Sequence, residues 1–82
     1  VKVGENEYII HAHMSIDDVN EKTGTGLSSE DYDSIGGLLI ELLGKIPEKG
    51  ESVRTGNVTI TAEEVEGTRI ELVRLRVEAE KE

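Results

Sequence analysis

The sequence predicts an α+β fold in which a small antiparallel sheet packs on a layer of two helices. A central segment carries apolar residues at helical spacing, segments on both sides alternate apolar and polar residues, and glycine-containing turns separate the later segments. With 82 residues, the chain is expected to form a single domain over residues 1–82, with its core at about 5–78.

The N-terminal part is expected to hold a strand at residues 8–13 and a helix at about 16–22. Ser15 precedes this helix, and with Asp18 three positions later it resembles a capping box. Asp17 and Asp18 would also suit the positive end of the helix dipole.

The helix expected at about residues 30–43 has the clearest pattern, with Ser28 or Ser29 as its N-cap. Its apolar stripe is Ile35, Leu38, Leu39, Leu42, Leu43 and Ile46. We expect Leu39 and Leu42 to be buried against the sheet.

Two glycines, Gly36 and Gly37, lie inside this helix, where each costs up to about 1 kcal/mol relative to alanine. This cost favours close packing against a neighbouring backbone over a phosphate-binding role. The pair Gly24 and Gly26 lacks the third glycine and the preceding strand of a dinucleotide-binding motif.

The C-terminal half is expected to contain two or three antiparallel strands, at about residues 51–54, 58–62 and 69–77. The last strand changes its apolar phase between Leu72 and Val73. This change predicts a β-bulge, or a strand with both faces partly covered.

The net charge of −9 disfavours nucleic acid and anionic lipid as partners. No apolar run is long enough to insert in a bilayer, and the absence of cysteine excludes thiolate sites and disulfides. No pattern of catalytic residues is present, so the chain is not expected to be an enzyme and no catalytic residue is assigned.

Two groups of residues are weak candidates for metal ligands. His11 and His13 could bind zinc or nickel from one strand face, with Asp17, Asp18 or Glu64 as a third ligand; the alternative is two exposed histidines. The aspartates Asp17, Asp18, Asp31 and Asp33 could bind magnesium, but such residues also stabilise helix starts.

Three arginines, Arg54, Arg74 and Arg76, are candidates for partner binding. Arg74 and Arg76 point the same way on one strand, and Arg54 is expected on a neighbouring strand. The alternative is cross-strand pairing with Glu63 or Glu71.

The segment Glu30–Pro47 (EDYDSIGGLLIELLGKIP) resembles the central signature of the CorC/HlyC transporter-associated domain. Arg69–Val77 (RIELVRLRV) resembles the last strand of that family, and His13–Asn20 its first helix. One departure is the strand Val58–Ala62, which lacks the phenylalanine of many relatives.

The resemblance implies a fold similar to one subdomain of certain FAD-binding enzymes. It also implies a fragment of a longer, multi-pass hemolysin-like or magnesium and cobalt efflux protein with a pair of CBS domains. The domain would be a regulatory or docking module at the cytoplasmic face of the membrane, contacting the CBS pair, the membrane domain or a second copy. No cofactor is expected; the alternative function is sensing of a divalent cation, an adenine nucleotide or FAD.

Overall fold

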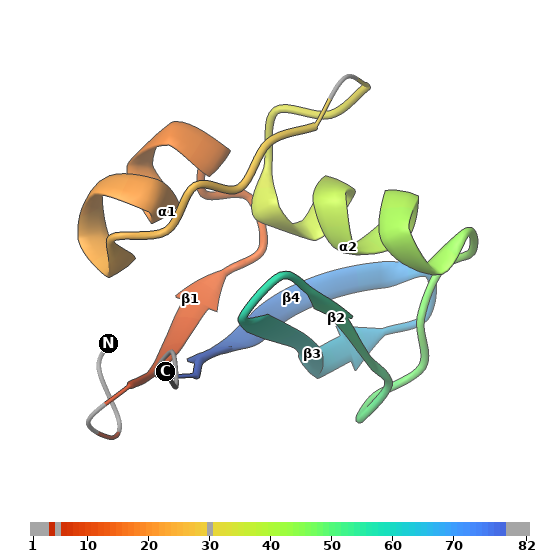
Figure 1. Cartoon of the computed structure of the whole chain (residues 1–82). Coiled ribbons are helices and arrows are strands. Elements are labelled where there is room, and N and C mark those ends of the chain that lie inside the picture. The colour runs from red at the N-terminus through yellow and green to blue at the C-terminus, as the bar shows by residue number, and fades with distance from the viewer. Residues whose placement is uncertain (1–3, 5, 30, 79–82) are drawn as a thin grey trace.

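The computed structural model describes residues 4, 6–29 and 31–78. Its elements are β1 (Glu7–His11), α1 (Ile16–Thr23), α2 (Ile35–Leu43), β2 (Ser52–Thr55), β3 (Val58–Glu66) and β4 (Arg69–Val77). The strands form one antiparallel sheet in the order β1-β4-β3-β2, and both helices lie on the same side of it (Figure 1). The predicted α+β class is therefore confirmed.

The cap of α1 follows the sequence pattern. The Ser15 hydroxyl accepts a hydrogen bond from the Asp18 backbone N–H at 3.0 Å, and Gly24 ends the helix in the left-handed region with φ of 72°. The predicted cap and the predicted helix are both confirmed.

The helix α2 begins at Ile35, so the prediction that it starts near residue 30 is wrong. Its cap is Ser34, whose hydroxyl accepts from the Gly37 N–H at 3.1 Å. The backbone before it is extended because the Ile16 N–H donates to the Asp33 carbonyl at 2.7 Å, and the Ile35 N–H to that of Met14 at 3.0 Å. These bonds tie the segment before α2 to the start of α1.

The two predicted N-caps, Ser28 and Ser29, lie in the loop before α2 instead. The Ser29 hydroxyl accepts a hydrogen bond from the Tyr32 N–H at 3.0 Å, but Tyr32 is not part of a helix. The strand β1 also ends earlier than predicted, at His11, because Met14 N–H donates to the His11 carbonyl at 3.1 Å and turns the chain.

The hairpin of β3 and β4 contains the predicted irregularity. Ala62 pairs with Val73 and Glu64 with Leu72, so Glu63 is an extra residue on β3. The next pairs leave Glu71 as an extra residue on β4. The second bulge compensates the first, so β3 runs to Glu66, four residues beyond its predicted end.

The core lies between the sheet and the two helices. Its buried apolar residues are Ile10, Ala12, Ile16, Val19, Ile35, Leu38, Leu39, Val58, Ile60, Ala62, Ile70, Val73 and Leu75. Branched aliphatics thus fill the core, as the composition predicts.

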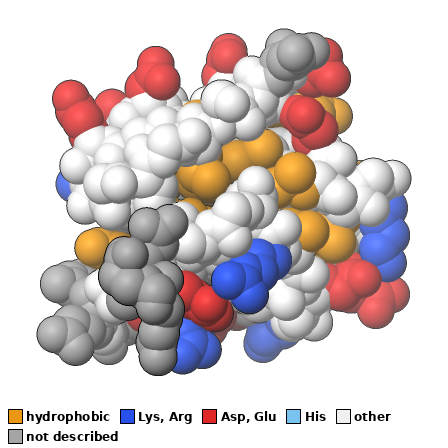
Figure 2. All heavy atoms as spheres, viewed as in Figure 1, with side chains coloured by type: hydrophobic (Ala, Val, Ile, Leu, Met, Phe, Trp, Pro, Cys, Tyr) orange, Lys and Arg blue, Asp and Glu red, His pale blue; other side chains and the backbone are white. Residues whose placement is uncertain are grey.

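Leu39 is fully buried, but Leu42 is 37% exposed, so its predicted burial is wrong. Leu42 lines a groove of about 230 Å³ together with Gly56 and Asn57 of the β2–β3 turn. These small and polar residues do not fill the space beside Leu42. Figure 2 shows apolar side chains reaching the surface in this part of the molecule.

The close backbone approach predicted for the helical glycines is confirmed for Gly36, whereas Gly37 packs against the Tyr32 side chain. A Cβ on Gly36 would lie 2.9 Å from the Ala12 Cβ and 3.0 Å from its carbonyl oxygen, and one on Gly37 would lie 2.6 Å from the Tyr32 Cβ. The Gly36 N–H donates to that Ala12 carbonyl at 2.8 Å. Glycine therefore lets the start of α2 reach the end of β1.

Among the described residues, no helix combines the length and the apolar character needed to cross a bilayer.

Candidate functional site

The sheet face away from the helices carries the three predicted arginines. Buried Val73 and Leu75 alternate with Arg74 and Arg76 along β4, so both arginines point away from the core. Arg54 lies on β2, and β3 separates it from β4. The expectation that Arg54 sits on a neighbouring strand is therefore wrong, although the face is shared. We call this surface the arginine face.

Arg74 is held by two carboxylates. Its Nε and Nη2 lie 2.9 and 3.3 Å from the two carboxylate oxygens of Glu63, and its Nη1 lies 3.3 Å from Glu7 Oε1. The hydrogen bond from Arg74 lowers the pKa of Glu63, and the same bond with Glu63 raises the pKa of Arg74. Glu63 can reach Arg74 from its position in the β3 bulge.

Cross-strand pairing with Glu63, the alternative for these arginines, is thus confirmed for Arg74. Glu71 instead contacts Arg69, with its Oε2 3.3 Å from Arg69 Nε.

Arg54 and Arg76 are the more accessible members of the arginine face, with side chains 60% and 63% exposed. Arg54 contacts Glu78 at 3.1 Å and donates from Nε to the Gly56 carbonyl at 3.1 Å. Arg76 reaches Glu7 at only 4.0 Å. Both guanidinium groups keep N–H donors available to solvent or a partner.

Glu7 and Glu78 are the members of this surface that the sequence did not identify. Each lies near one end of the chain. Glu7 meets the arginines because β1 pairs with β4. Glu78 is held near Arg54 because the Asn57 side-chain amide donates to the Glu78 backbone carbonyl at 3.0 Å. The only sequence signal for these two glutamates is the alternation of apolar and polar residues along the strands, which indicates the face to which a side chain points.

The two histidines do not share a strand face, because β1 ends at His11 and His13 lies in the following turn. Their exposed rings nevertheless lie side by side, with centroids 5.3 Å apart and planes tilted by 32°. None of the expected third ligands joins the two histidines. Within the described residues, no group of three or more His, Cys, Asp or Glu side chains could hold a metal ion.

The four aspartates are also dispersed. Asp17 and Asp18 lie exposed in the first turn of α1, whereas Asp31 and Asp33 precede the cap of α2 and are not in its first turn. The expectation that both pairs start helices therefore holds for the first pair alone.

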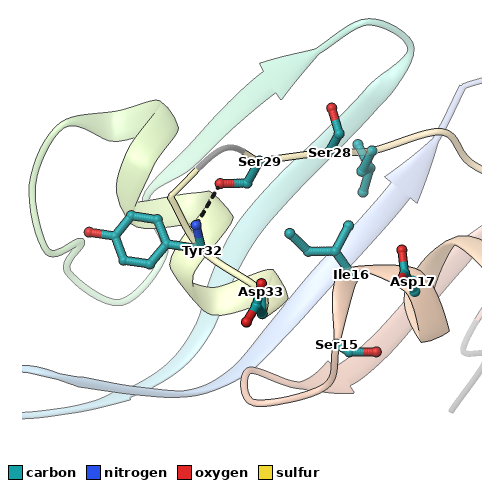
Figure 3. Close-up of a pocket in the computed structure, with 8 residues that line it drawn as sticks. Ser15, Ile16, Asp17, Ser28, Ser29, Tyr32 and Asp33 are labelled. Carbon is teal, nitrogen blue, oxygen red and sulfur yellow. Dashed lines mark hydrogen bonds between the residues drawn. The ribbon is translucent and has the colours of Figure 1, made fainter.

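Asp17 and Asp33 line one pocket of about 400 Å³ together with Ser15, Ile16, Leu27, Ser28, Ser29 and Tyr32. Figure 3 shows the two carboxylates on different sides of Ile16, not directed at a common point. The polar lining of this pocket is therefore mostly hydroxyl groups, and its two carboxylates do not converge as ligands of one metal ion would.

These features define a small sheet-and-helix module with one open, charged sheet face. The family model described as the CorC_HlyC transporter associated domain matches residues 1–79. The chain therefore belongs to the CorC_HlyC transporter associated domain family.

Solved and curated relatives agree with this assignment. A hemolysin domain from Enterococcus faecalis is 43% identical, with a TM-score of 0.86 and 94% of each chain covered. A CorC associated region from Neisseria meningitidis is 36% identical, with a TM-score of 0.83 and coverage of 92% of this chain and 93% of that one. The magnesium and cobalt efflux protein CorC of Salmonella typhimurium is 30% identical over 76 residues.

Those 76 residues are 93% of this chain but 26% of the Salmonella protein. The chain thus spans about a quarter of the length of this curated relative. It is a domain of the kind found in CorC efflux proteins and hemolysins.

Proposed function

We propose that this domain is a non-catalytic regulatory and docking module of a CorC/HlyC-type hemolysin-like or magnesium and cobalt efflux protein. The observation that carries the proposal is its match, over nearly its whole length, to one quarter of an efflux protein. A module of this size, attached to a much larger chain, would act by contacting the rest of that chain.

In this proposal the domain lies at the cytoplasmic C-terminus of its parent protein and modulates ion transport. Its partners are the CBS-domain pair and the membrane domain of the same protein, with a second copy in a homodimer as a further contact. The hemolysin domain of E. faecalis, of which this chain covers 94%, is a domain of comparable size.

The arginine face is the surface proposed for docking. Arg54 and Arg76 are largely exposed, and exposed ion pairs contribute little to stability. Carboxylates of a partner can therefore replace Glu78 and Glu7 at small cost. Arg54 and Arg76 each lie near a carboxylate of this chain, Glu78 and Glu7, so an acidic partner would bind by taking the place of these carboxylates.

Arg74 has a different role in this proposal. Its contacts with Glu63 and Glu7 fix the middle of the face and keep Glu7 beside Arg76. Arg74 therefore positions the docking residues rather than contacting the partner first.

The test uses the double variant Arg54→Glu/Arg76→Glu in the full-length protein. We expect altered magnesium and cobalt efflux from cells, while the melting temperature of the domain alone changes little, because both side chains are exposed. Arg69→Glu is the matched control, since Arg69 is 79% exposed, lies on β4 and pairs with the nearby Glu71. Unchanged efflux in the double variant, at equal expression, would place the docking surface elsewhere.

A further inference from the structure

The turn after β1 fixes the backbone between the two histidines. Ala12 lies between them, is 7% exposed, and uses both of its backbone groups. Its N–H donates to the Glu71 carbonyl at 3.0 Å, and its carbonyl accepts from the Gly36 N–H at 2.8 Å. His11 and His13 thus extend from an anchored backbone, while both side chains are exposed to solvent.

The spacing of the two rings matches that of two imidazoles on one metal ion. A metal about 2.1 Å from one nitrogen of each ring lies roughly 3.2 Å from each ring centroid, so a tetrahedral angle places the centroids roughly 5.2 Å apart. The observed centroid separation is 5.3 Å. Because both side chains are exposed, packing does not block rotation of either ring, and one nitrogen of each ring could turn toward a shared ion.

We propose that His11 and His13 form an open, two-ligand site for a borderline divalent cation: Zn²⁺, Ni²⁺ or Co²⁺. Imidazole nitrogen suits these ions, whereas Mg²⁺ requires oxygen ligands. Water completes the coordination shell, so the bound ion exchanges readily with solvent. This proposal is independent of the docking role of the arginine face.

The electrostatic surroundings favour a cation. The chain has a net charge of −9, which raises the local concentration of divalent cations near its surface. Arg69 lines a pocket together with His13, but its Nε lies 3.3 Å from Glu71 Oε2, so this positive charge is largely compensated.

The chain makes the test specific because it contains two histidines and no cysteine. Zn²⁺, Ni²⁺ and Co²⁺ are titrated separately into the untagged chain by calorimetry, and Co²⁺ is also followed by proton NMR. We expect one site for each ion, with Co²⁺ shifting the imidazole resonances of both histidines, and no competition from excess Mg²⁺.

His11→Gln and His13→Gln should each weaken binding by at least about tenfold, since even the loss of an outer-shell partner costs that much. Asp17→Asn/Asp18→Asn is the matched control and should bind as the wild type does. Circular dichroism melts verify that the variants fold, as expected for exposed positions.

Three results would overturn the site. The first is that none of the three ions binds at millimolar concentration. The second is that both histidine variants bind with wild-type affinity, and the third is that the aspartate control loses binding. Co²⁺ shifts at carboxylate-bearing residues instead of the imidazoles would overturn it without any variant.

Discussion

Gly36→Ala tests the contact that joins the start of α2 to the end of β1. In an open helix this change would stabilise the chain by up to about 1 kcal/mol through helix propensity. Here the added methyl would lie 2.9 Å from the Ala12 Cβ and 3.0 Å from the Ala12 oxygen, which also accepts the Gly36 N–H. Neither atom belongs to the end of a flexible side chain, so the helix itself must shift.

Inserting a methyl group into such a packed site typically costs about 1–3 kcal/mol, and we expect a net loss in this range. For a domain of this size, each kcal/mol lowers the melting temperature by about 4–8 °C. Urea unfolding and thermal melts followed by circular dichroism measure both quantities.

Gly26→Ala is the matched control, since nothing lies within 4 Å of its added Cβ and its φ is not in the left-handed region. We expect a neutral change or a gain of up to about 1 kcal/mol, because alanine restricts the unfolded chain. If Gly36→Ala proves as stable as Gly26→Ala, the close approach of α2 to β1 does not exist in solution.

Two further predictions concern the core and the response to acid. Leu39→Ala should cost about 2–5 kcal/mol, and Leu42→Ala distinctly less, because Leu39 is fully buried and Leu42 is 37% exposed; equal losses in urea unfolding would contradict this packing of α2. The hydrogen bond from Arg74 lowers the folded-state pKa of Glu63 below its ordinary value. The stability that this carboxylate contributes is therefore present above the ordinary glutamate pKa of about 4.3 and is lost as the pH falls through the lowered pKa. The gap in melting temperature between the wild type and Glu63→Gln should therefore shrink on acidification, and a gap that widens would show that the pair does not stabilise the fold.

Features that depend on residues close together in the chain could be predicted from the sequence. The cap of α1 at Ser15, the burial of Leu39 and the phase change near Leu72 all follow from spacing within a few residues. The family signature in Glu30–Pro47 is likewise a run of consecutive residues, and it is sufficient to predict the fold from the sequence.

The tertiary structure decided what depends on residues distant in the chain. The start of α2 is set by its cap Ser34 together with backbone bonds from Ile16 and Ile35 to residues in other segments. The two serines expected to cap it, Ser28 and Ser29, lie in the preceding loop. Local pattern cannot reveal such a bond, because the partner is chosen by how the segments pack.

The same reason separates what was predicted of the candidate surfaces from what was not. The sequence identified Arg74 and its possible partner Glu63, but the second partner, Glu7, lies 67 residues away and meets it through strand pairing alone. The ring spacing of His11 and His13 likewise arises from a turn held by bonds to β4 and α2. Residue types and alternation thus determined which side chains were candidates, whereas long-range register and packing decided which of them meet.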